Sequence, residues 1–166
     1  MDINLKKILI FGNSGSGKST LAKQLVKRHN LAHLDLDILA WLPTTPPKRV
    51  PLEESKEKIN EFVNTNASWV IEGCYTDLLK MVSHISSEII FLNLSIEECI
   101  ENAKSRPWEP HKYESKEAQD ANLDMLINWI KDYTNRDDVF SFNSHMRFYE
   151  EFNGKKVIYD SNDRST

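Results

Sequence analysis

Short apolar runs alternate along the chain with segments whose apolar residues recur at helical spacing. Five such runs predict buried strands, at 7–11, 31–37, 69–71, 88–94 and 156–159. The amphipathic patterns between them predict helices, at 18–29, 52–63, 95–104, 125–133 and 144–153. Strands that alternate with helices are typical of a parallel sheet covered on both faces, so the pattern predicts a three-layer α/β fold.

Local signals predict where several of these elements begin and end. Ser95 and Glu98 form a capping box, which predicts that a helix begins just after Ser95. Gly154 follows the last helical pattern, and we expect it to end that helix in a left-handed conformation. Residues 42–51 hold four of the six prolines and therefore predict a loop.

Composition and charge narrow the class of protein. The 166 residues fit one domain, and a net charge of −4 argues against a globally basic nucleic-acid binder. No apolar run reaches the length that crosses a bilayer, and the two cysteines and five histidines lack metal-binding spacing. We expect a single cytoplasmic domain over 1–166 that binds a small molecule, with no membrane partner and no nucleic-acid partner.

Three of the five glycines fall in one segment, Gly12–Gly17. Together with Lys18 and Ser19 they satisfy GxxxxGK[ST], between a predicted strand and a predicted helix. Backbone N–H groups and the helix N-terminus suit phosphate, the lysine reaches the β- and γ-phosphates, and the serine hydroxyl suits Mg²⁺. The motif predicts a site for a nucleoside triphosphate and Mg²⁺, formed by Gly12, Asn13, Ser14, Gly15, Ser16, Gly17, Lys18, Ser19 and Thr20; ATP is the expected nucleotide, and the motif alone does not select it over GTP.

Two aspartates stand at the end of the second predicted strand. Strand periodicity places Asp35 and Asp37 on one face, at the carboxyl edge where parallel sheets bind ligands. Such a pair suits orientation of Mg²⁺ and acceptance of a proton from a hydroxyl, so we expect Asp35 to bind metal and substrate and Asp37 to be catalytic. A helix cap or a turn is the alternative role of these residues.

These features together resemble the small P-loop kinases of the adenylate kinase and shikimate kinase type. A closer resemblance is to the FlaR-related subgroup (DNA topology modulation proteins), carried by His33-Leu34-Asp35, Trp41 and the segment 69–75, Trp-Val-Ile-Glu-Gly-Cys-Tyr. The resemblance covers about residues 7–94. It implies a P-loop NTPase fold with a five-stranded parallel sheet of order 2-3-1-4-5, a substrate-binding insert at 39–67 and a lid at 105–116.

The resemblance also implies roles for individual side chains. Trp41, Gly73 and Tyr75 would line the acceptor pocket, and Arg106 would stabilise charge on the transferred group. Glu72 and Cys74 depart from the subgroup, which usually has Asp and Asn there. Shikimate kinases bind the substrate carboxylate with an arginine where this chain has His145, so shikimate is not the expected acceptor.

The leading hypothesis is transfer of the γ-phosphoryl group of ATP to a small-molecule acceptor, with Lys18, Asp37 and Arg106 as catalytic residues. Two alternatives stay open. One is a nucleotide-binding regulator or slow ATPase, like the FlaR-related proteins, without a small-molecule acceptor. The other is a nucleoside or nucleotide kinase.

Overall fold

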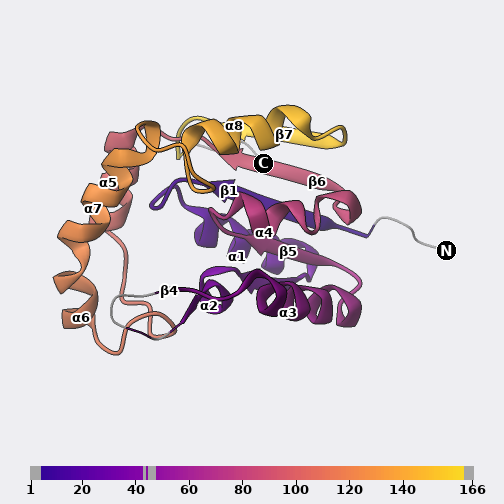
Figure 1. The fold of residues 1–166 in the computed structure, drawn as a ribbon, viewed down its shortest axis with the longest axis horizontal. Helices are drawn as coiled ribbons and strands as arrows, with labels where there is room; N and C mark the ends of the chain where they lie inside the picture. The colour runs from indigo at the N-terminus through magenta and orange to yellow at the C-terminus, as the bar shows by residue number, and fades with distance from the viewer. Residues whose placement is uncertain (1–4, 43, 45–47, 163–166) are drawn as a thin grey trace.

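The computed structural model describes residues 5–42, 44 and 48–162, and its centre is a five-stranded parallel sheet (Figure 1). The strands are β1 (Lys7–Gly12), β2 (Ala32–Asp35), β5 (Trp69–Glu72), β6 (Glu88–Leu92) and β7 (Lys155–Tyr159). Their spatial order is β2-β5-β1-β6-β7, and all four neighbouring pairs are parallel. Counted within this sheet the order is 2-3-1-4-5, so the predicted fold class and strand order are confirmed.

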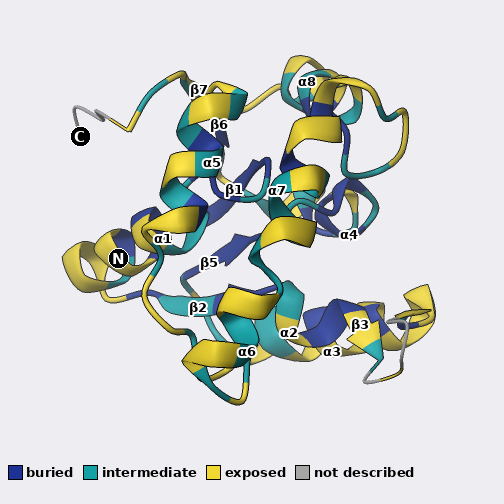
Figure 2. Cartoon of the chain, turned by 90° about the vertical axis from the view of Figure 1, so that its left-hand side faces the viewer, coloured by how far each residue is buried: buried dark blue, intermediate teal, exposed yellow. Residues whose placement is uncertain are grey.

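Helices cover both faces because neighbouring residues of β1 point in opposite directions. Ile8 and Ile10 pack with buried residues of α1 (Lys18–His29), α5 (Ile96–Lys104) and α7 (Leu123–Lys131). Leu9 and Phe11 pack on the other side against a second set of helices. These are α2 (Asp37–Ala40), α3 (Leu52–Thr65), α4 (Thr76–Lys80) and α8 (Phe142–Glu151). The sheet is therefore buried between two apolar layers, and the central strands appear almost wholly buried in Figure 2.

The second strand is shorter than the sequence pattern predicts. β2 ends at Asp35, and Asp37 is the first residue of α2, so the two aspartates do not share a strand face. The Asp37 backbone N–H donates to Asp35 Oδ1 at 3.0 Å. Short polar side chains such as Asp35 bond to nearby backbone groups in this way, and such bonds compete with those that would extend the strand. The turn role is thus correct for Asp35, although the two side chains remain neighbours.

Other boundaries also depart from the pattern. The segment predicted as a loop at 42–51 contributes to a hairpin, in which β3 (Trp41–Leu42) pairs antiparallel with β4 (Lys48–Arg49). Residues 43 and 45–47 lie outside the described residues. The single helix predicted around 125–133 is divided into α7 and a 3-10 turn, η2 (Asp132–Thr134), and α6 (Lys116–Ala121) precedes it. Met125 is 70% exposed, so it does not belong to the apolar face of α7.

The end of the last helix also differs. α8 ends at Glu151, Phe152 is extended, and Gly154 is not among the glycines with positive φ. A Cβ atom at Gly154 would lie 2.7 Å from Cε2 of the Phe152 ring. The glycine therefore serves close packing of that ring rather than a left-handed cap. A short 3-10 turn, η1 (Ser83–Ile85), completes the elements.

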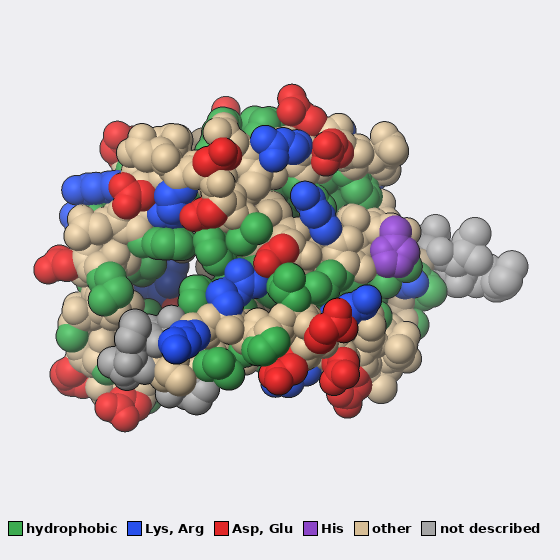
Figure 3. Space-filling model, viewed as in Figure 1, with side chains coloured by type: hydrophobic (Ala, Val, Ile, Leu, Met, Phe, Trp, Pro, Cys, Tyr) green, Lys and Arg blue, Asp and Glu red, His purple; other side chains and the backbone are tan. Residues whose placement is uncertain are grey.

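None of the helices in the described ranges is long and apolar enough to cross a membrane. The carboxyl ends of the strands face the side where α5 and α7 pack on one another (Figure 1). Figure 3 shows the molecule hollowed on this side, and the candidate site lies here.

Candidate active site

The P-loop leads from β1 to α1 through a backbone that only glycine adopts easily. Gly15 and Gly17 have φ angles of 78° and 89°, in the left-handed region. A Cβ atom on Gly15 would lie 2.3 Å from the backbone oxygen of Cys99, and one on Gly12 would lie 2.5 Å from the oxygen of Leu92. The glycine cluster therefore permits both the turn and the close approach to β6 and α5.

The loop is held from behind by side chains that do not face the cavity. Asn13 is 2% exposed, and its Nδ2 donates to the carbonyl of Ile130 in α7 at 3.2 Å. Asn102 in α5 donates to the carbonyl of Gly15 at 2.8 Å. Ser16 is fully buried, and its hydroxyl has no hydrogen-bond partner among the described residues. Asn13 and Ser16 thus contribute backbone and packing to the phosphate loop.

Lys18 folds back over the loop. Its Nζ donates to the carbonyl oxygens of Asn13 at 2.8 Å and Gly12 at 3.3 Å. These carbonyls hold the ammonium above the start of α1, where a phosphate chain would meet both the lysine and the helix N-terminus.

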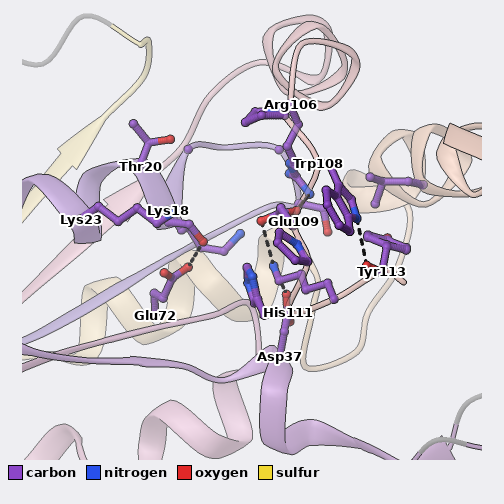
Figure 4. Close-up of a pocket in the computed structure, with 18 of the residues that line it drawn as sticks. Lys18, Thr20, Lys23, Asp37, Glu72, Arg106, Trp108, Glu109, His111 and Tyr113 are labelled. Carbon is purple, nitrogen blue, oxygen red and sulfur yellow. Dashed lines mark hydrogen bonds and ion pairs between the residues drawn. The ribbon is translucent and has the colours of Figure 1, made fainter. Parts of the chain in front are cut away.

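Glu72, at the carboxyl end of β5, is the acidic side chain that contacts the P-loop. It is 2% exposed, and its Oε1 accepts a hydrogen bond from the Ser19 hydroxyl at 2.8 Å. Its Oε2 lies 2.6 Å from His33 Nε2. Figure 4 shows Glu72 close beside Lys18 on the P-loop side of the cavity.

The residues present fit a nucleotide with magnesium. No group of three or more His, Cys, Asp or Glu side chains in the described ranges is arranged to hold a metal ion unaided. Mg²⁺ is commonly held by one or two protein oxygen ligands together with substrate phosphates and water, and Ser19 with Glu72 supplies oxygens of that kind. The glycine cradle beside them is the complementary feature for phosphate.

The side of the cavity opposite the P-loop is built on Asp37. The Tyr75 hydroxyl donates to Asp37 Oδ1, and the indole Nε1 of Trp41 donates to the Tyr75 oxygen at 2.8 Å. Tyr75 is 2% exposed, so its ring is held by packing. Its hydroxyl therefore fixes the orientation of the Asp37 carboxylate. Gly73, two residues before Tyr75, is buried. A Cβ atom on Gly73 would lie 2.9 Å from Leu36 Cβ, so a larger residue would not fit there without a shift.

Segment 105–116 brings a lysine to the two aspartates. Lys112 Nζ lies 2.9 Å from Asp37 Oδ2, 3.4 Å from Asp35 Oδ2 and 3.7 Å from Glu109 Oε2. His111 Nε2 lies 3.6 Å from Asp35 Oδ2. Asp35 is thus engaged by segment 105–116 rather than by Ser19. The predicted lid arginine, Arg106, instead pairs with Glu109 at 3.4 Å.

The charged side chains of this cluster lie close enough to shift one another's pKa. Burial, then the nearby carboxylates of Asp37 and Glu72, raises the pKa of Asp35 above its ordinary value. Burial acts in the same direction on Asp37, but the Lys112 ammonium prevails and lowers the pKa of Asp37. The pKa of Lys112 is raised by its carboxylate neighbours against the effect of burial. Asp37 is therefore ionised near neutral pH and accepts hydrogen bonds.

A cavity of about 270 Å³ joins the two halves of the site. The predicted residues that line it are Ser14, Gly15, Gly17, Lys18, Ser19, Thr20, Asp37 and Arg106. The other predicted residues do not line it: Gly12, Asn13, Ser16, Asp35, Trp41, Gly73 and Tyr75. In Figure 4, Lys18 and Glu72 face Asp37 and His111 across the cavity, with Arg106 and Trp108 above.

The hairpin contributes an arginine among aromatic rings. The guanidinium carbon of Arg49 lies 5.0 Å from the ring centroid of Tyr75 and 5.4 Å from that of Phe140. Arg49 also pairs with Asp77 at 3.2 Å. Trp41 stacks parallel to Phe140 with 6.3 Å between ring centroids. This aromatic cluster fixes Trp41 and Tyr75, and through them Asp37.

His145 is a packing residue. It is fully buried, and its Nε2 lies 2.8 Å from the carbonyl oxygen of Cys74, so Nε2 donates. The Tyr133 hydroxyl lies 2.7 Å from Nδ1 and donates to it. Burial, with the charges of Lys18 and Arg136, lowers the pKa of His145 to about 3. The imidazole is neutral and ties α8 to the segment that carries Cys74 and Tyr75.

The lowered pKa of His145 predicts that the free energy of unfolding decreases in acid. The unfolded chain binds a proton at His145 below about pH 6.5, whereas the folded chain does so only near pH 3, so stability falls as pH falls between those values. Between pH 7 and pH 5 the loss from this residue is about 2 kcal/mol. Urea unfolding of wild type and His145→Gln at both pH values measures it. An equal loss in both proteins would contradict the assignment.

Three residues of the candidate site have no role in the pattern of the sequence: Glu72, His33 and Lys112. Glu72 departs from the family pattern, and the signal that indicates it is its place as the acid that ends the strand beside β1. His33 belonged to a motif without a role. Lys112 had no local signal that distinguished it from Arg106, because only the path of segment 105–116 decides which cation meets Asp37.

Comparisons with known proteins agree with this geometry. Residues 8–122, more than half of the chain, match the AAA_18 family, described as an AAA domain. The chain belongs to this family, and its fold is that of a P-loop kinase-like protein.

Among solved structures with a similar fold are two kinases. A shikimate kinase from Bacteroides thetaiotaomicron aligns with a TM-score of 0.52 and 18% identity, over 96% of this chain and 90% of that chain. A sugar kinase from Janibacter sp. HTCC2649 aligns with a TM-score of 0.55 and 13% identity, over 96% and 87%. At these identities the likeness concerns the fold alone.

One curated relative is similar in sequence. The "Uncharacterized protein YqaC" of Bacillus subtilis (strain 168) is 37% identical over 68 residues. The match covers 41% of this chain and 38% of that protein, so the chain spans well under half of the relative's length.

Proposed function

We propose that the protein transfers the γ-phosphoryl group of ATP to a hydroxyl or phosphate group of a small molecule. The observation that carries this proposal is the shared cavity. Lys18 and Ser19 of the P-loop line it together with Asp37, an ionised carboxylate beyond the phosphate site. A protein that only bound a nucleotide would need no oriented carboxylate at that place. The kinase-like fold supports the proposal. We also propose that the chain is a member of the FlaR-related subgroup.

The side chains divide the work of transfer. The P-loop backbone and Lys18 bind the phosphates. Ser19 and Glu72 would hold Mg²⁺, which when bound would supply positive charge to the phosphate oxygens. Asp37 accepts the hydrogen bond of an acceptor hydroxyl and orients its oxygen, while Tyr75 and Trp41 keep the carboxylate in place. Lys112, beside Asp37, places a positive charge where it would stabilise the negative charge spread over the oxygens of the transferred group.

Segment 105–116 covers the cavity. Gln119 in α6 holds the segment, because its Oε1 accepts from the Glu109 backbone N–H at 2.9 Å and its Nε2 donates to the carbonyl of Pro107 at 3.1 Å. Lys112 on the acidic pair adds a contact across the cavity. Covering the site excludes water, which favours transfer to the acceptor over hydrolysis.

A screen of small molecules tests the proposal. The full chain is incubated with ATP, MgCl₂ and pools of sugars, polyols, hydroxy acids, nucleosides and nucleotides, and mass spectrometry detects a gain of one phosphate. We expect one chemical class to be phosphorylated, and Lys18→Ala to abolish the product. Phosphorylation of nucleosides or nucleotides would select that sub-class. ATP hydrolysis that no pool stimulates would refute an acceptor and favour the slow ATPase.

A further inference from the structure

His33 contacts the candidate site but has no role in the proposed phosphoryl transfer. It lies on β2, two residues before Asp35, so both side chains leave the same face of the strand. Residue Asp35 pairs in register with Glu72 of the neighbouring strand β5. His33 pairs with Val70, two residues before Glu72, and its ring extends toward the carboxyl end of the strands to contact the Glu72 carboxylate.

The contact with Glu72 indicates which ring nitrogen of His33 carries a hydrogen. Nε2 of His33 lies 2.6 Å from Glu72 Oε2, and a carboxylate oxygen accepts, so Nε2 is the donor. The other oxygen, Oε1, accepts from the Ser19 hydroxyl. Both oxygens of a carboxylate that is 2% exposed are thus engaged, and its orientation toward the P-loop is determined by two donors on opposite sides.

The carboxylate needs this support because its surroundings repel it. Asp35 is its register partner across the strands, and Asp37 belongs to the same acidic group. Lys112 contacts Asp35 and Asp37, whereas His33 contacts Glu72. Without the imidazole, the hydrogen bond from the Ser19 hydroxyl would be the one that the described residues still give Glu72, and one of its two carboxylate oxygens would lose its fixed position.

We propose that His33 is a positioning residue that holds Glu72 against Ser19 and so sets the affinity of the P-loop for the magnesium of a bound nucleotide. The inference rests on the proposed function insofar as it assumes a magnesium nucleotide as ligand. It requires no phosphoryl transfer. Hydrogen-bond partners behind a ligating side chain commonly change metal affinity by 10- to 100-fold.

The test is equilibrium binding of a fluorescent ATP analogue to the full chain at increasing free Mg²⁺. We expect His33→Ala to raise the half-saturating Mg²⁺ concentration about tenfold or more. Its affinity for the analogue in EDTA should stay within about twofold of wild type, because the phosphate loop is unaltered. His33→Gln, whose amide nitrogen can still donate to Glu72, should restore the half-saturating concentration to within about threefold.

Controls separate positioning from general stability. His84→Ala removes an exposed histidine of η1, far along the chain from the P-loop, and should leave Mg²⁺ dependence unchanged. His33→Asn, whose shorter amide does not reach Glu72, should behave like His33→Ala and replaces it if the alanine variant does not fold. Unchanged Mg²⁺ dependence in the folded variant, or an equal loss of affinity in EDTA, would overturn the proposal.

The outcomes distinguish the two proposals. Phosphoryl transfer by wild type together with normal Mg²⁺ dependence in His33→Ala refutes the role of His33 and leaves the proposed function standing. A shifted Mg²⁺ dependence in a protein that phosphorylates no acceptor supports the role of His33 and refutes the transferase.

Discussion

Asp37→Asn is expected to lower the rate of phosphoryl transfer by about 10³-fold while the affinity for ATP stays within about threefold. The carboxylate is the acceptor-side group that the Tyr75 hydroxyl and the Lys112 ammonium both address. An amide keeps the shape and one hydrogen-bonding oxygen but loses the charge that orients and deprotonates an acceptor hydroxyl. The phosphate loop keeps its own hydrogen bonds, because Lys18 donates to the carbonyls of Gly12 and Asn13 and Ser19 donates to Glu72 rather than to Asp37.

The measurement is initial rate against the acceptor found by the screen, beside binding of a fluorescent ATP analogue. Asp120→Asn is the matched control, since it removes an exposed carboxylate whose ion pair with Lys116 lies on the surface of α6. Turnover of Asp37→Asn close to that of the control would remove Asp37 from the mechanism. A parallel loss of ATP affinity would place the residue in the nucleotide site instead.

Lys112→Met is expected to lower kcat by about 10²-fold, and Arg106→Gln to lower it by tenfold or less. Removing one group that stabilises transition-state charge typically costs 10²- to 10³-fold. Lys112 Nζ is 2.9 Å from Asp37, whereas Arg106 is paired with Glu109 at the start of segment 105–116. Methionine keeps the length of the lysine side chain, so the change reports on charge rather than on packing.

Lys116→Met controls for the loss of a lysine nearby, because its side chain is 62% exposed and pairs only with Asp120 among the described contacts. If Arg106→Gln reduced kcat more than Lys112→Met, the charge-stabilising role would return to Arg106, as the sequence predicted. A rise in the KM for acceptor at constant kcat would make Lys112 a binding group alone.

The sheet edge that carries the candidate site follows from the sequence, and the contacts between its side chains do not. The P-loop lies where the motif predicts it, because glycines followed by lysine and serine encode a local backbone shape. The acidic group was predicted at the right edge of the sheet but in the wrong local structure, since Asp35 satisfies a turn and ends β2. Residues that meet across distant segments, such as His33 with Glu72, have no signature in either segment alone.

Periodicity and motif spacing therefore determined the class of fold and the phosphate loop, whereas the strand order was implied only by the resemblance to P-loop kinases. These are local properties, repeated every two or nearly four residues, and packing on both faces of the sheet enforces them. Tertiary structure decided which carboxylate meets Ser19 and which cation meets Asp37. Those pairings depend on strand register and on the path of segment 105–116, and both are settled only when the whole chain has closed around the cavity.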